Sequence, residues 1–209
     1  MRKVSVFFAV VFFVSSFAFS QNAYVDKVNK FCSELNQKIS AEGDYRNYVM
    51  IHTVNYESNV RAIGKQNTVV SFYYTQPGDS VKEENGIAEF IDIYKPPIKI
   101  TIEYNIAASQ KVLIEYYPDE NGKLIYFHYS TKGEYTNGEE FFYFKDGKPV
   151  KIKYIATDEG KEVLEKYKTL DKETGFAKEE LKKCDSILKK FGEYNKFFDN
   201  MVKIEKMDK

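Results

Sequence analysis

The chain has little of the side-chain chemistry from which most catalytic and metal centres are built. Its 209 residues include two histidines, two cysteines and no tryptophan. A zinc site needs about three or four His, Cys or carboxylate ligands at close spacing, and the few candidates lie far apart: His52, His128, Cys32 and Cys184. The Gly-x-Ser-x-Gly pattern of many serine hydrolases is also absent. We therefore predict no metal, no organic cofactor and no catalytic residue that a motif can identify.

The one long apolar run lies at the start of the chain. Arg2 and Lys3 precede an apolar segment over 4–19. Ala18 and Ser20 place small residues at the minus-three and minus-one positions before Gln21. A charged start, an apolar centre and small residues at the cleavage site are typical of a secretory signal peptide. We therefore expect 1–20 to be a signal peptide and 21–209 to form a single exported domain, either periplasmic or secreted.

The chain also lacks an excess of charge of either sign. The precursor has 31 basic and 31 acidic side chains, and removal of the leader would leave 29 basic and 31 acidic ones, a net charge of −2. Such a balance exerts little long-range attraction on nucleic acid or anionic lipid. No apolar run beyond the leader approaches the ~18 residues that cross a bilayer. We predict no nucleic-acid partner and no membrane span in the exported chain.

Cysteine is limited to a single pair, Cys32 and Cys184. In an oxidising compartment such a pair is a candidate disulfide. Cysteine also packs well as a small apolar side chain, so two buried thiols are the alternative. A thiol and a histidine could together form a nucleophile, but both cysteines lie on apolar helical stripes, where burial disfavours the thiolate. The disulfide and the buried thiols both remain open on the sequence alone.

Apolar residues recur at helical spacing at both ends of the exported chain. They predict an amphipathic N-terminal helix over 22–41, with an apolar side made of Tyr24, Val28, Phe31, Cys32, Leu35 and Ile39. They also predict a long C-terminal helix, with an apolar side made of Ala177, Leu181, Cys184, Ile187, Leu188, Phe191, Phe198 and Met201. A shorter segment over 163–170 fits either a helix or a strand.

Between the helices the apolar period changes to two, which indicates strands. Strands are predicted around 48–54, 68–75, 88–94, 98–104, 110–117, 123–130, 139–145 and 149–155. Helices that are segregated from strands indicate an α+β fold. We expect an antiparallel meander sheet of about seven or eight strands, with the N-terminal helix and the long C-terminal helix packed on one face.

Two turns give the clearest local signals. Asn121-Gly122 and Asp146-Gly147 supply the positive φ angles that tight hairpins require. The surrounding segments echo one another, with Tyr-Pro-Asp-Glu-Asn-Gly-Lys-Leu-Ile at 117–125 and Phe-Lys-Asp-Gly-Lys-Pro-Val at 144–150. Over about residues 110–155 the chain resembles the YD and MORN-like hairpin repeats of exported bacterial proteins. The resemblance implies a hairpin shape and no particular activity.

Aromatic residues are dense on the predicted strands, and the chain holds 17 tyrosines and 17 phenylalanines. One sheet face must meet the helices, and the other would then present rings outward. Tyrosine combines apolar area with a hydroxyl group, which suits interfaces and carbohydrate stacking. We therefore expect an exported, non-catalytic binding or protein-interaction module whose partner is an envelope or extracellular protein or glycan. Its candidate ligand-binding residues are Tyr116, Tyr126, His128 and Tyr143.

Two other functions stay open. A periplasmic or secreted hydrolase could draw an acid and a base from the carboxylates in or beside strands, which are Glu89, Asp92, Glu103, Glu115, Glu139 and Glu140. The simpler interpretation places these carboxylates at solvent-facing strand positions. An inhibitor or immunity-type protein would use the same aromatic surface and would need one defined protein target.

Overall fold

The computed structural model describes residues 23–41, 49–61, 64–75, 78–84, 87–93, 95–106, 110–133, 136–158 and 167–207. The chain divides into two compact units, Met1–Ser40 and Ala41–Lys209. In the first unit the described residues form a helix over 23–40, as predicted, and its buried side chains recur every three or four residues: Val25, Val28, Cys32 and Leu35. The predicted signal peptide lies outside the described residues, and a single domain over 21–209 stays a prediction.

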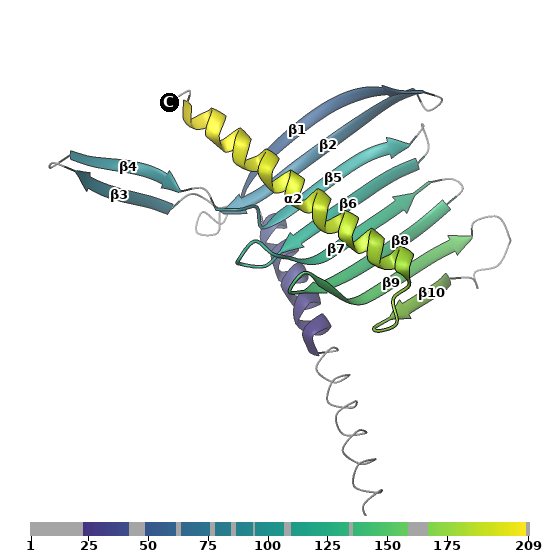
Figure 1. Ribbon diagram of the computed structural model, residues 1–209. Helices are drawn as coiled ribbons and strands as arrows, with labels where there is room; N and C mark the ends of the chain where they lie inside the picture. Colours follow the sequence, from purple (N-terminus) through teal and green to yellow (C-terminus); the bar gives the residue numbers. More distant parts are fainter. Residues whose placement is uncertain are drawn as a thin grey trace, which may run out of the picture. The chain divides into compact units, whose positions relative to one another are not determined.

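The second unit is built around one antiparallel sheet of eight strands, which confirms the predicted meander (Figure 1). Its strands lie in the order β1 (Val49–Val60), β2 (Gly64–Thr75), β5 (Lys99–Ile106), β6 (Gln110–Pro118), β7 (Leu124–Lys132), β8 (Thr136–Lys145), β9 (Lys148–Asp158) and β10 (Tyr167–Lys172). Every neighbouring pair in that order is antiparallel. The fold is therefore α+β.

One predicted strand belongs elsewhere. The segment predicted as a strand at 88–94 is β4 (Ile87–Ile93), which pairs with β3 (Gly78–Glu84) in a two-stranded sheet of its own. The sequence of β3, GDSVKEE, has Val81 as its one large apolar residue, so the period-two pattern missed it. Alternation identifies a strand but does not name its partner. The large sheet consequently joins β2 directly to β5.

The segment that fitted either a helix or a strand contributes a strand. Tyr167–Lys172 forms β10 and pairs antiparallel with β9 over six residue pairs. Six residues are too few to distinguish a helical from a strand period. The available edge of β9 supplies the hydrogen bonds that make the extended form stable.

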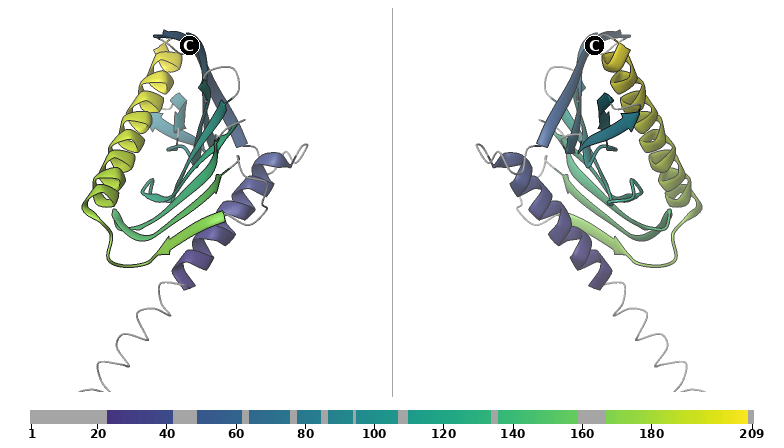
Figure 2. Two further views of the ribbon diagram at one scale, coloured as in Figure 1. Left: turned by 90° about the vertical axis from the view of Figure 1, so that its right-hand side faces the viewer. Right: turned by 90° about the vertical axis from the view of Figure 1, so that its left-hand side faces the viewer.

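The long C-terminal helix, α2 (Lys178–Met207), crosses one face of the sheet (Figures 1 and 2). Its first turn carries Glu179 and Glu180, and a carboxylate oxygen of Glu180 accepts a hydrogen bond from the Ala177 amide at 2.6 Å. Acidic groups at this end satisfy open amides and complement the positive end of the helix dipole. We call the side of the sheet beneath α2 the helix-covered face and the other side the opposite face.

The core of the second unit lies between α2 and the helix-covered face. The Phe198 ring is centred 5.2 Å from Tyr74 and 5.5 Å from Phe72, while Phe191 stacks on Tyr116 at 5.9 Å. The C-terminal half of α2 therefore packs over β2, and its middle packs over β6. The buried core side chains are Val70, Phe72, Tyr74, Ile100, Ile102, Tyr116, Leu124, Phe127, Phe142, Phe144, Ile152, Cys184, Ile187, Phe191, Phe198 and Val202. Full burial of one such large apolar side chain contributes about 1.5–3 kcal/mol.

Both predicted hairpins are confirmed. Between β6 and β7, Asp119 Oδ1 accepts hydrogen bonds from the Asn121 and Lys123 amides, and Gly122 has a φ of 74°. Between β8 and β9, Asp146 and Gly147 have φ angles of 51° and 74°. Two successive positive φ angles match the twist of the flanking strands. These turns fix which residues of β6, β7, β8 and β9 face each other.

Candidate functional site

The sheet register decides which of the predicted ligand-binding residues share a face. Tyr126 of β7 is the cross-strand partner of Tyr117 on β6 and of Tyr143 on β8. All three side chains therefore lie on the same side of the sheet, the opposite face. His128, two residues along β7, lies on that same face between Glu115 and Phe141. The structure therefore brings together Tyr126, His128 and Tyr143, as expected.

Tyr116 does not belong to this group, which corrects the sequence-based prediction. It lies opposite Phe127 on the helix-covered face, is 1 % exposed and packs against Phe191 of α2. Tyr116 and Tyr117 are adjacent, so they point to opposite sides of the strand. The alternation left open which of the two shares a face with Tyr126, because that depends on the register across the hairpin.

The opposite face carries a row of rings across three strands. The ring centroids of Tyr117 and Tyr126 lie 5.4 Å apart, and those of Tyr126 and Tyr143 lie 5.0 Å apart. Phe141 stacks on His128 beside this row. Tyr117 and Tyr143 are buried, at 1 % and 6 % exposure, whereas Tyr126, Phe141 and His128 are half-buried. We call these five residues the aromatic row.

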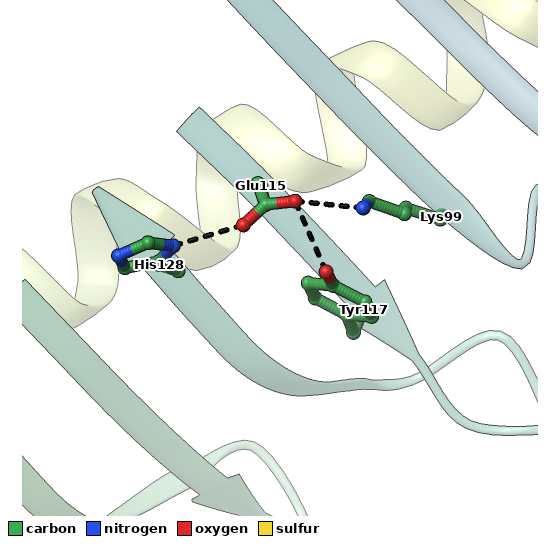
Figure 3. Close-up of polar contacts among 4 residues, drawn as sticks. All are labelled: Lys99, Glu115, Tyr117 and His128. Carbon is green, nitrogen blue, oxygen red and sulfur yellow. Dashed lines mark hydrogen bonds and ion pairs between the residues drawn. The ribbon is translucent and has the colours of Figure 1, made fainter. Parts of the chain in front are cut away.

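A compact ion cluster adjoins the aromatic row (Figure 3). Lys99 Nζ lies 2.7 Å from Glu115 Oε1, and the Tyr117 hydroxyl donates to the same oxygen at 3.0 Å. His128 Nδ1 lies 2.8 Å from Glu115 Oε2. Both carboxylate oxygens of Glu115 therefore make contacts, and together they bind three partners.

Strand pairing explains why these side chains meet. Glu115 of β6 lies opposite Thr101 of β5 and His128 of β7. Lys99 lies two residues before Thr101, on the same side of β5. Its ammonium group also lies 4.8 Å from the centre of the Tyr117 ring, within the range of a cation–π contact. The cluster is therefore built on three rigid, adjacent strands.

The environment of Glu115 favours its charged form. Burial alone would raise the pKa of its carboxyl group, but the hydrogen bonds from His128 and Lys99 and their positive charges outweigh burial and lower that pKa to about 2. The carboxylate is ionised throughout the neutral range. Since a general acid must hold a proton at working pH, Glu115 is unsuited to that role.

His128 leaves one nitrogen without a partner. With Nδ1 directed at Glu115, its Nε2 atom is buried and has no hydrogen bond among the described residues. A carboxylate that orients an imidazole in this way is also found in catalytic dyads and triads. Here the open nitrogen lies in the interior, so a substrate would reach it only after the surrounding side chains move.

The other carboxylates named from the sequence are dispersed. Glu103 is exposed on β5, Glu139 is half-buried on the opposite face of β8, and Glu140 forms an ion pair with Lys183 of α2 from the helix-covered face. Glu89 and Asp92 lie in β4, where the side chains are outside the description. Among the described residues no group of three or more His, Cys, Asp or Glu side chains could hold a metal ion.

The two cysteines lie in different units. Cys184 is a free thiol at 1 % exposure on the buried side of α2, and burial together with the charges of Asp185 and Glu180 raises its pKa to about 11. A thiol with that pKa is a poor nucleophile at neutral pH. Cys32 is buried on the N-terminal helix. A disulfide between the two cysteines stays a prediction.

Sequence reasoning missed three members of this site: Lys99, Tyr117 and Phe141. Lys99 alternates with Ile98 and Ile100, which is the pattern of a solvent-facing strand position, yet its side chain is only 9 % exposed. The signal that could have found it is the pairing of β5 with β6, which places Lys99 near Glu115. Glu115 was named only as one of several carboxylates.

Two general findings bear on function. Within the residues that the structure covers, neither helix combines the length and the apolar character that a bilayer crossing requires. The chain matches no protein-family model, no curated protein and no solved structure.

Proposed function

We propose that this protein is an exported, non-catalytic binding module, and that it contacts its ligand through the aromatic row on the opposite face of the sheet. The observation that supports this is the alignment of Tyr126, His128 and Phe141, all half-buried, on two neighbouring strands. Lys153 of β9 lies opposite Phe141, with its ammonium group 5.7 Å from the ring centre. Rings edged by an amino group suit a ligand that has both apolar surface and hydrogen-bond acceptors.

The rest of the row makes those contacts rigid. Tyr117 and Tyr143 are buried on either side of Tyr126, so the exposed part of the Tyr126 ring is held in one orientation. The ion cluster fixes His128 in the same way through Glu115. A preorganised surface binds with less loss of side-chain entropy than a flexible one. The half-buried rings are therefore the proposed contact residues, and the buried rings support them.

A hydrolase is the second candidate, favoured by the Glu115–His128 contact and the open Nε2 atom. It would need an acid that stays protonated near neutral pH. The pKa of Glu115 moves in the other direction, and Cys184 is held as the thiol. An inhibitor or immunity-type protein remains within the binding proposal, because it differs only in having one protein target.

The proposal can be tested by affinity capture from the envelope fraction of the native cell. The exported protein and its Tyr126→Ala and Phe141→Ala variants are compared, and Leu181→Ala serves as the control because Leu181 is a 43 % exposed apolar residue on α2, away from the row. We expect the two row variants to lose the captured ligand while Leu181→Ala retains it. Capture that survives both row substitutions would show that the ligand binds elsewhere.

A further inference from the structure

Exposed apolar side chains gather at one edge of the large sheet. Among the described residues the large apolar side chains that are most exposed are Ile51 at 51 %, Tyr56 at 50 %, Leu181 at 43 %, Phe197 at 43 % and Ile204 at 60 %. Ile51 and Tyr56 belong to β1, and Phe197 and Ile204 belong to the C-terminal half of α2. Only Leu181 lies at the other end of α2.

Ring contacts place the C-terminal half of α2 beside β1. Phe198 lies 6.1 Å from His52 of β1, and Phe197 lies 5.9 Å from Phe72 of β2 (ring centroids). Figure 1 shows β1 at the margin of the sheet, with the C-terminal end of α2 near it. Ile51 and Tyr56 point to opposite faces of β1, and Tyr56 points to the side on which α2 carries Phe197 and Ile204.

β1 also lacks the devices that usually protect an edge strand. It is twelve residues long, contains Glu57 as its one formally charged residue and no proline, and pairs with β2 without a register shift. Among the described strands β1 has a neighbour on one side only. Natural sheets protect such edges with lysine, proline, bulges or short strands.

The other edge of the same sheet is protected. β10 is six residues long and has three charged residues, Lys168, Asp171 and Lys172. The two edges therefore differ, because half of the residues of β10 are charged, whereas β1 is twice as long and has one charged residue. An edge that is long, carries a single charged residue and has exposed apolar side chains on both faces has the features of a protein interface.

We propose that β1 is the interface of a symmetric dimer, in which the β1 strands of two copies of this chain pair antiparallel. The open backbone groups of an edge strand are satisfied best by another extended strand. A two-fold axis lets one surface complement itself, so that no second protein is needed. The proposal is independent of the function proposed above, because the aromatic row lies on β6, β7 and β8.

Charge and side-chain pairing favour a second copy as the occupant. In an antiparallel pairing centred on Thr53, the two Glu57 carboxylates lie eight residues apart along the strands, roughly 27 Å, so they do not repel each other strongly. The same register places Tyr56 opposite Met50 of the second copy, an apolar cross-strand pair. On the other face the same register places Ile51 beside Asn55 of the second copy.

The test compares the molar mass of the full exported protein with that of three lysine variants, by light scattering and sedimentation over a range of concentrations. Ile51→Lys and Tyr56→Lys place a charge at the proposed interface. Leu181→Lys places the same charge on an exposed apolar position far from β1, and is the matched control. All three positions are exposed, so each variant should keep the far-ultraviolet spectrum and the melting temperature of the parent protein.

We expect a dimer whose dissociation constant rises at least tenfold in Ile51→Lys and in Tyr56→Lys and is unchanged in Leu181→Lys. Hydrogen exchange should show the amides of β1 becoming more protected as the protein is concentrated through the dissociation constant. A protein that stays monomeric at every soluble concentration overturns the proposal. A dimer whose dissociation constant is unchanged by both β1 substitutions also overturns it, as does a dimer that forms without added protection of the β1 amides from hydrogen exchange.

Discussion

The imidazole of His128 lies flat against the ring of Phe141, with the ring planes 8° apart and the centroids 4.8 Å apart. Stacking fixes the plane of the imidazole, and the bond from Nδ1 to Glu115 fixes its rotation within that plane. Phe141 in turn lies between His128 and Lys153 across three strands. The ion cluster and the aromatic row are therefore coupled through His128. A substitution in either group should change the side-chain positions in the other.

Removing the charge of Glu115 should destabilise the protein strongly. Glu115→Gln leaves the ammonium group of Lys99 buried without its counter-charge, and breaking one partner of a buried pair typically costs about 3–5 kcal/mol. Lys65→Met is the control, because it breaks the exposed Lys65–Glu57 pair, which should contribute less than about 1 kcal/mol. Urea unfolding measures both. Equal losses of stability would show that the cluster is no tighter than a surface pair.

Stability should also fall in acid because of this one carboxylate. Its pKa is lowered in the folded protein from 4.5 to about 2, so its contribution is complete above about pH 4.5 and is lost as the pH falls toward 2. A shift of that size corresponds to roughly 3 kcal/mol. The unfolding free energy of the parent protein should therefore drop more steeply between pH 5 and pH 2 than that of Glu115→Gln. Parallel pH curves for the two proteins would contradict the assignment.

Alanine substitutions at Tyr116 and Tyr126, two of the predicted ligand-binding residues, should lower the stability of the protein by different amounts. Tyr116→Ala removes a ring at 1 % exposure from beneath α2 and should cost about 3–5 kcal/mol, as for other large core rings. Tyr126→Ala removes a half-buried ring and should cost clearly less. Thermal unfolding of the two variants decides this. If Tyr126→Ala is as damaging as Tyr116→Ala, the aromatic row is interior structure and the proposed binding surface is wrong.

Export should remove the first twenty residues. The leader pattern, with Ala18 and Ser20 before Gln21, predicts that material from the native host begins at Gln21 or within a few residues of it. N-terminal sequencing or intact-mass measurement shows the cut directly. A protein that retains Met1 in the cell envelope would contradict the prediction.

Local signals predicted most of the architecture. The positive-φ turns at Gly122 and Gly147 and the apolar stripe of α2 are each encoded within a few neighbouring residues. The partner of β4, the burial of Lys99 and the face of Tyr116 depend on which strands pair and in which register. Those choices involve residues far apart in the chain, so alternation along one strand leaves them undetermined.

The hairpin of β3 and β4 interrupts the chain between two strands that are hydrogen-bonded neighbours. The ladder between β2 and β5 runs from Thr68↔Tyr104 to Tyr73↔Lys99, and the Ile98 amide extends it by donating to the Tyr73 carbonyl at 2.7 Å. The large sheet is complete across that gap. The segment that joins β2 to β5 can therefore change in length and sequence, as an insertion does, while the core, the ion cluster and the aromatic row keep their register.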